Sequence, residues 1–292
     1  MLGTAFPASR LLLVEQPGPW GRAGLLDSRF DRAVAHRLIG GLSRAGVRVL
    51  AIRRPGRTGA GSPRRWALVD CREDRERMIW GQFDDDADLL QLDVMSILQS
   101  GLAGSQVDSE PLYAVCAHGT HDVCCAIRGR PVAAALERVR PGRVWECSHV
   151  GGDRFAANVL VLPSGMLYGR VVAPSAEALV HAVDRGGVLD QHIRGRVGFP
   201  PDVQAAMTMA YREQPQLDVL DVRFVARAQL SPHSSVVQLR VRRDLMEVEV
   251  RAEKAGSQWI TCQATEPAQV TVFEPGVLRP AGRAGIGPAE VG

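Results

Sequence analysis

Alternating apolar and polar positions predict a β-α-β unit in the first hundred residues. A short apolar run over 10–14 is typical of a strand, and the Pro- and Gly-rich segment Gln16–Gly21 ends it. Further elements follow the same periodicities: a helix over 31–45, strands over 47–52 and 66–71, and a helix over 89–99 after the acidic run Asp84–Asp88. We interpret the acidic run as a solvated turn.

A Gly- and Ser-rich stretch over 100–110 predicts a boundary, and a second unit follows it. The expected elements are a strand over 112–115, a loop over 116–125, a helix over 127–139, a strand over 144–147, hairpin strands over 158–162 and 166–172, and a helix over 176–184. This order, a β-α-β unit followed by a β-hairpin and a helix, predicts a small α/β sandwich of the thioredoxin type.

The pattern changes after residue 195. A helix over 202–212 precedes largely amphipathic strands over 219–228, 236–242, 247–253, 259–264 and 270–273. We therefore expect an α/β fold with a small α+β segment at its C-terminal end. The predicted division is 1–105, 106–194, 195–275 and a disordered tail over 276–292. No internal repeat of fixed period is found.

Composition excludes several classes of protein. Of the 292 residues, 46% are hydrophobic and 23% charged, which is typical of a globular protein and excludes a disordered chain or a coiled coil. No apolar run approaches the roughly 20 residues that a membrane helix needs. The N-terminus carries no secretory signal, so we expect a cytoplasmic location without membrane contact. The net charge of +3 gives no reason to expect a nucleic-acid partner.

The cysteines carry the strongest chemical signal. Four of the six lie between residues 116 and 147, which in a cytoplasmic protein favours a metal or redox site over a disulfide framework. Two predicted strands are each followed by a loop rich in soft ligands: Cys116-Ala-His118-Gly-Thr-His121-Asp-Val-Cys124-Cys125 and Cys147-Ser-His149-Val-Gly-Gly-Asp153. Thiolates and imidazoles suit iron–sulfur clusters and zinc. We expect the remaining pair, Cys71 and Cys262, to be small buried hydrophobes in strands.

Together with other motifs, these loops resemble the sucrase/ferredoxin-like family over roughly residues 10 to 210. The motifs are Glu15-Gln-Pro-Gly-Pro-Trp-Gly21, Val47–Gly56, Cys-x-His-Gly, Cys-Ser-His-x-Gly-Gly, Asn158–Arg170, Arg194-Gly-Arg and Pro200-Pro201-x-Val-Gln204-Ala-Ala206. The resemblance implies a thioredoxin-like ferredoxin domain whose [2Fe-2S] cluster is held by two cysteines of the first loop and two histidines of the second. By position these ligands are Cys116, Cys125, His149 and residue 153, and spacing alone allows Cys124 in place of Cys125.

The chain departs from the family pattern at one ligand. Asp153 stands where the pattern has histidine. A carboxylate can bind ferric iron, and its negative charge should lower the reduction potential of a cluster. Two alternatives are open: Cys147 replaces Asp153 as a ligand, or this member has no cluster.

The resemblance implies an electron-transfer protein with a redox partner protein or reductase, rather than a catalyst, so no catalytic residue is assigned. The alternatives are a zinc-binding protein using the same residues and a metal-free interaction protein that retains the fold. A glycosidase, which the family's name suggests, requires paired carboxylates about 5–10 Å apart, and Asp84–Asp88 is a poor candidate for them. For His118 and His121 we expect roles around the ligands rather than ligation.

Overall fold

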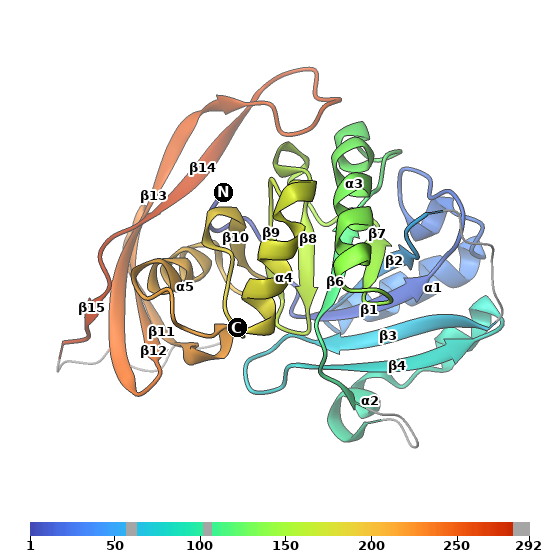
Figure 1. The fold of residues 1–292 in the computed structure, drawn as a ribbon, viewed down its shortest axis with the longest axis horizontal. Coiled ribbons are helices and arrows are strands. Elements are labelled where there is room, and N and C mark those ends of the chain that lie inside the picture. Colours follow the sequence, from blue (N-terminus) through green and yellow to red (C-terminus); the bar gives the residue numbers. More distant parts are fainter. Residues whose placement is uncertain (57–62, 102–106, 283–292) are drawn as a thin grey trace.

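A ten-stranded sheet forms the centre of the molecule (Figure 1). The computed structural model describes residues 1–56, 63–101 and 107–282. The strand order is β10-β9-β8-β6-β7-β2-β1-β3-β4-β5. The bounds are β1 (Arg10–Glu15), β2 (Val47–Arg53), β3 (Arg64–Asp70), β4 (Arg77–Phe83), β5 (Val107–Asp108), β6 (Leu112–Cys116), β7 (Val144–Cys147), β8 (Val159–Leu162), β9 (Met166–Tyr168) and β10 (Ile193–Arg196).

In the described residues, four α-helices accompany this sheet and a fifth begins the C-terminal segment. They are α1 (Arg32–Arg44), α2 (Val94–Ser100), α3 (Val123–Val139), α4 (Ala176–Asp184) and α5 (Pro201–Glu213). Asp31 begins α1, because its carboxylate accepts a hydrogen bond from the Val34 N–H and satisfies one of the free N–H groups of the first turn. The mixture of a large sheet with flanking helices confirms the predicted α/β class.

The sheet consists of two halves with the same topology. In the first, β1 and β2 are parallel, β3 pairs antiparallel with β1, and β4 with β3, giving the order β4-β3-β1-β2. In the second, β6, β7, β8 and β9 have the same relations, giving β9-β8-β6-β7. The halves meet where Ile52 and Arg53 of β2 pair with Cys147 and Glu146 of β7. The predicted order, a β-α-β unit followed by a hairpin and a helix, is present in the second half as β6-α3-β7-β8-β9-α4 and, unexpectedly, also in the first as β1-α1-β2-β3-β4-α2.

The two halves share one hydrophobic core and cover their other faces separately. Apolar side chains of β1, β2, β3, β6, β7 and β8 form a common cluster that includes Leu13, Ile52 and Trp145. The opposite face of the first half packs on α1 and α2, and that of the second half on α3 and α4. Because side chains alternate between the two faces of a strand, each central strand contributes to two cores.

The C-terminal segment forms a second, antiparallel sheet that packs on α5. Its strands are β11 (Val222–Ser231), β12 (Ser234–Val241), β13 (Asp244–Gln258), β14 (Ala268–Pro275) and β15 (Arg279–Pro280). The turn between β13 and β14 extends towards the N-terminal end of α3 (Figure 1). None of the helices in the described part of the chain has the length and apolarity to cross a bilayer.

Several predicted elements need correction. The strand expected over 259–264 is a turn, because β13 continues only to Gln258. β4 was not predicted, and the helix expected over 89–99 is a 3-10 turn (Asp86–Gln91) followed by α2. Within the tail predicted to be disordered, residues 276–282 are ordered: β15 pairs with β13 and Leu278 is buried. The rest of that tail, like part of the boundary over 100–110, lies outside the described residues.

Candidate metal centre

The first two candidate ligands lie where β6 ends and α3 begins. Cys116 is the last residue of β6, and Cys125 lies in the first turn of α3. This helix starts four residues earlier than predicted because Asp122 caps it, its carboxylate accepting from the Cys124 N–H at 2.9 Å. Gly129 lets α3 approach the strand, since a Cβ at that position would lie 2.1 Å from the Cys116 carbonyl oxygen. Both thiols are therefore buried side by side.

The other two candidates lie in the loop after β7. His149 follows the strand by two residues, and Asp153 begins a 3-10 turn over Asp153–Phe155. The chain reverses between them through Gly151 and Gly152, which have φ of 82° and 74°, a region that favours glycine. A Cβ on Gly152 would also lie 2.4 Å from the Arg194 guanidinium. These glycines return Asp153 towards His149.

The four side chains converge in one buried site. The donor atoms of Cys116, Cys125 and His149 all lie within 4.8 Å of one another. The Cys125 thiol donates to Asp153 Oδ1 at 3.2 Å, and the same oxygen lies 3.0 Å from His149 Nδ1. His121 joins the edge of the group, with its ring stacked on that of His149 at 3.8 Å between centroids. Two thiols, an imidazole and a carboxylate thus face a common centre.

Hydrogen bonds among the four candidate ligands shift their pKa values. The hydrogen bond from Cys125 outweighs burial and holds the pKa of Cys116 well below its ordinary value, while the same bond raises the pKa of Cys125. Burial opposes protonation of His149, but hydrogen bonds to Asp153 and Cys116 raise its pKa to about 9. Burial also disfavours the Asp153 anion, yet His149 keeps the pKa of Asp153 below its ordinary value. Metal binding here requires the Cys125 and His149 protons to leave, because a thiolate and a neutral imidazole are the forms that bind metals.

Backbone hydrogen bonds fix the loops that carry the donors. His118 is buried; its Nε2 lies 2.6 Å from the Gly21 carbonyl oxygen, and its Nδ1 accepts from the His149 N–H at 3.2 Å. Burial lowers the pKa of His118, which keeps the ring neutral for both bonds. Arg48 of β2 donates to the His149 carbonyl at 2.9 Å. The first half of the sheet thus supports a site whose donors all come from the second.

Two buried residues, Arg194 and Asn158, support the loop of Asp153 and were not predicted to do so from the sequence. Arg194 is 1% exposed and donates to the Gly151 carbonyl and to Asn158 Oδ1, each at 2.8 Å. Asn158 in turn donates to the Gly152 carbonyl at 3.0 Å. Arg194 and Asn158 both belong to motifs that carry the family resemblance, which was the available signal, but nothing in their spacing indicates that they hold the loop of Asp153.

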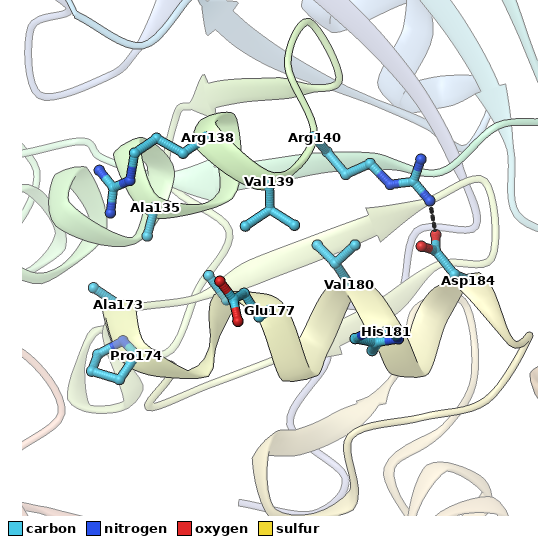
Figure 2. A pocket seen from close by; sticks show the side chains of 11 residues that line it. Ala135, Arg138, Val139, Arg140, Ala173, Pro174, Glu177, Val180, His181 and Asp184 are labelled. Atoms are coloured by element: carbon cyan, nitrogen blue, oxygen red, sulfur yellow. Dashed lines mark ion pairs between the residues drawn. The ribbon is translucent and has the colours of Figure 1, made fainter.

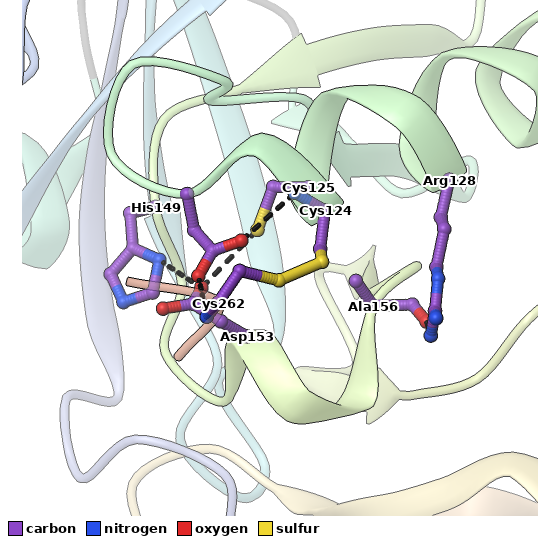
Figure 3. The surroundings of a disulfide bond; sticks show 8 residues. Cys124, Cys125, Arg128, His149, Asp153, Ala156 and Cys262 are labelled. Carbon is purple, nitrogen blue, oxygen red and sulfur yellow. Dashed lines mark hydrogen bonds and ion pairs between the residues drawn. A yellow bond between two sulfur atoms is a disulfide. The ribbon is translucent and has the colours of Figure 1, made fainter. Parts of the chain in front are cut away.

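The remaining cysteines lie outside this group. Cys147 is buried in β7 beside Cys116, and burial raises its pKa well above the ordinary value. Cys124 points away from Cys125 and forms a disulfide with Cys262 (Figure 3). The expectation that Cys262 is a buried hydrophobe in a strand is wrong, because it is exposed in the turn after β13. Cys71 is buried as expected, just beyond the end of β3.

A separate groove lies between α3 and α4, at the far end of α3 from Cys125 (Figure 2). An ion pair between Arg140 and Asp184 closes one end, and Glu177 and His181 lie along α4. No cysteine lines it among the described residues. The donors that suit a soft metal are therefore concentrated at the other end of the helix.

Comparison with known proteins finds a family match over the part of the chain that contains the candidate ligands. The sucrase/ferredoxin-like family model matches residues 1–195, which include all four candidate ligands. The altered inheritance of mitochondria protein 32 of Meyerozyma guilliermondii is 27% identical over 104 residues, a match that covers 32% of this chain and 37% of that relative, well below two thirds of its length. No solved structure matches the chain.

Proposed function

This chain belongs to the sucrase/ferredoxin-like family, and on that premise we propose that it is an electron-transfer protein whose [2Fe-2S] cluster is held by Cys116, Cys125, His149 and Asp153. One observation carries the proposal: the convergence of two thiols and an imidazole within 4.8 Å, with a carboxylate bonded to two of them. All four donors lie at or beyond the C-terminal ends of the parallel strands β6 and β7.

The donor types support a [2Fe-2S] cluster whose two irons have different ligands. The thiols of Cys116 and Cys125 form one pair, and His149 with Asp153 forms a second, nitrogen- and oxygen-donating pair. Rieske centres have the corresponding division, with two cysteines on one iron and two histidines on the other. Here one of the two imidazoles is replaced by a carboxylate, which favours the ferric state because a hard anionic oxygen binds ferric iron well.

The surroundings suit one-electron exchange at a protein surface. A [2Fe-2S] cluster accepts and releases single electrons. Cys116, Cys125 and Asp153 are at most 4% exposed and exclude water, whereas the His149 side chain is 22% exposed. We infer that a redox partner protein or reductase approaches on the side of His149 and His121.

The direct test is elemental and spectroscopic. The full chain, purified without oxygen, is expected to be brown, to contain iron and sulfide in near-equal amounts, and to lose both in Cys116→Ser. Cys71→Ser is the matched control, because Cys71 is an equally buried thiol outside the group. A colourless protein after attempted cluster reconstitution would contradict the proposal.

Zinc is the second candidate, because four donors around one centre also suit a single tetrahedral ion. In that case the purified protein contains about one zinc per chain and no sulfide. Chelator treatment should then lower the melting temperature, since metal binding contributes to folding stability. If the purified protein contains neither iron nor zinc and the chelator leaves its melting temperature unchanged, a metal-free interaction protein is favoured instead.

A further inference from the structure

A second cysteine pair joins two distant parts of the chain beside the metal centre. Cys124, in the first turn of α3, forms a disulfide with Cys262, 138 residues further along the chain (Figure 3). We propose that this pair is a second redox centre, a dithiol–disulfide couple that exchanges electron pairs with dithiols. Its state determines whether the turn between β13 and β14, residues 259–267, stays attached to α3.

Accessibility distinguishes this pair from the other cysteines. Cys262 is exposed and Cys124 partly exposed, whereas Cys71, Cys116, Cys125 and Cys147 are all buried. A disulfide is reduced by direct attack of a thiolate on one of its sulfur atoms, so the attacking group must reach it. Cys262 is the more exposed of the two residues, and we assign its sulfur as the atom attacked.

The exchange balances with a dithiol as the reductant. The first thiolate of the dithiol forms a bond to Cys262 Sγ, the Cys124–Cys262 bond breaks, and Cys124 leaves as a thiolate. The second thiolate of the dithiol then attacks the dithiol's first sulfur, which is bonded to Cys262 in this mixed disulfide, and Cys262 leaves as a thiolate. The dithiol loses two electrons and becomes a disulfide, while the protein gains two electrons and its two thiolates take up two protons.

A hydrogen bond links the disulfide to the start of α3. The Cys262 N–H donates to Asp122 Oδ2 at 2.7 Å, while Asp122 Oδ1 accepts from the Cys124 N–H. Asp122 is 0% exposed. One carboxylate therefore caps the helix that carries Cys125 and also holds the turn. Reduction removes the covalent attachment and leaves this hydrogen bond between the Cys262 backbone and Asp122.

The proposal does not depend on a cluster. Cys124 and Cys262 exchange electrons through thiol chemistry, whereas the candidate ligands Cys116 and Cys125 are buried free thiols outside the pair. Its failure is therefore distinguishable from failure of the iron–sulfur proposal, because thiol labelling reports the first and iron with sulfide content reports the second.

The test uses the full chain and differential alkylation. Protein equilibrated in buffers of reduced and oxidised dithiothreitol is labelled without denaturation, and labelled peptides are identified by mass spectrometry. We expect Cys124 and Cys262 to become labelled together as the buffer becomes more reducing and to lose labelling when it is re-oxidised. In Cys262→Ser, Cys124 should be labelled in every buffer, whereas Cys71→Ser should behave as the native chain.

Hydrogen exchange then tests the attachment of the turn. The peptide containing residues 259–267 should exchange faster in the reduced protein and in both Cys124→Ser and Cys262→Ser, with exchange in β12 unchanged. Two results would overturn the proposal: a disulfide that dithiothreitol opens only after denaturation, or two cysteines that label fully under oxidising conditions. Unchanged exchange of the turn on reduction would overturn its role in attachment.

Discussion

The two halves of the ten-stranded sheet have the same topology but unlike chemistry. In each half a parallel β-α-β unit is followed by an antiparallel pair of strands and a helix, and in each an aspartate, Asp31 or Asp122, caps the first helix. The second half ends β6 with Cys116, whereas the first ends β1 with Glu15. Two residues after the end of β7 lies His149, whereas two residues after the end of β2 lies Pro55. The topology therefore positions strand-end loops, and individual side chains determine whether those loops carry candidate metal ligands.

The first half of the sheet contains none of the four candidate ligands but still contributes to the site. Its loop after β1 accepts hydrogen bonds from Thr120, whose hydroxyl lies 2.5 Å from the Trp20 carbonyl oxygen, and contacts His118 through the Gly21 carbonyl. Arg48 supports His149 from β2. One half supplies the donors and the other holds their backbone in place, which is a division of roles that substitutions can test.

The largest effect on bound iron and sulfide should follow from removing a candidate ligand from the second half. We expect Cys125→Ser to lose nearly all bound iron and sulfide, because a serine hydroxyl is a poor replacement for a thiolate ligand. Iron and sulfide analysis of anaerobically purified protein measures this. Cys147→Ser removes a neighbouring buried thiol and should retain both elements; equal losses in the two variants would contradict the assigned ligand set.

A second prediction concerns the joint that fixes both halves to the C-terminal sheet. Glu76, between β3 and β4, bonds to Arg196 of β10 and, at 2.8 Å, to Arg223 of β11. The Arg196 side chain is 0% exposed. Glu76→Gln leaves this buried charge without its main partner and should lower the free energy of unfolding by about 3–5 kcal/mol. Urea unfolding of the metal-free protein measures the change.

This difference in stability should depend on pH. Burial opposes ionisation of Glu76, but a backbone hydrogen bond and the two arginines hold its pKa below the ordinary value. A carboxyl group with a lowered pKa stabilises the fold above its unfolded pKa, about 4.3, and this contribution is lost as pH falls through the lower, folded value. The native chain and Glu76→Gln should therefore differ most near pH 7 and converge in acid. A constant difference at all pH values would contradict this account.

A smaller effect should come from the supporting half. Arg48→Met retains the aliphatic stem but removes the hydrogen bond to the His149 carbonyl. Outer hydrogen bonds around a metal site typically contribute 10–100-fold to metal affinity, and because this bond reaches a backbone atom we expect about 10-fold. Competition with a chelator measures it. Arg44→Met, on the solvent side of α1, is the control and should leave affinity unchanged; an equal loss there would remove the assigned role of Arg48.

The finest distinction concerns the carboxylate. Asp153→His should retain the cluster and raise its reduction potential by tens of millivolts, since a neutral ligand replaces an anionic one; about 59 mV corresponds to a tenfold change for one electron. The added imidazole should also steepen the dependence of the potential on pH. Redox titration followed by absorbance checks both. If Asp153→Ala retains iron with an unchanged spectrum while Cys147→Ser loses it, the fourth ligand is Cys147.

Local patterns predicted most elements of the fold. The alternation over 47–52 and the helical spacing over 31–45 correspond to β2 and α1, because burial of one face imposes these periodicities. The repeated topology was not predictable, since two segments with the same strand order need share no residues. β4 was missed because its pattern is interrupted by Gly81, which is required where the Trp66 ring lies against the strand.

The candidate site was predictable only in part. Residue types and the family resemblance indicated the four donors, and the structure brings all four together. Spacing left Cys124 and Cys125 equivalent, and only the direction of the first turn of α3 separates them, with Cys125 facing Asp153 and Cys124 facing Cys262. The partner of Cys124 lies 138 residues away, a separation that no local pattern reports.

The turn that carries Cys262 acts on α3 as a tethered ligand. Because it belongs to the same chain, its effective concentration at Asp122 is set by the geometry of the β13–β14 hairpin and does not fall when the protein is diluted. A separate protein that binds this end of α3 must compete with an occupant of constant local concentration. Access to the start of α3 is consequently governed by the hairpin and its disulfide rather than by how much of the protein a cell contains.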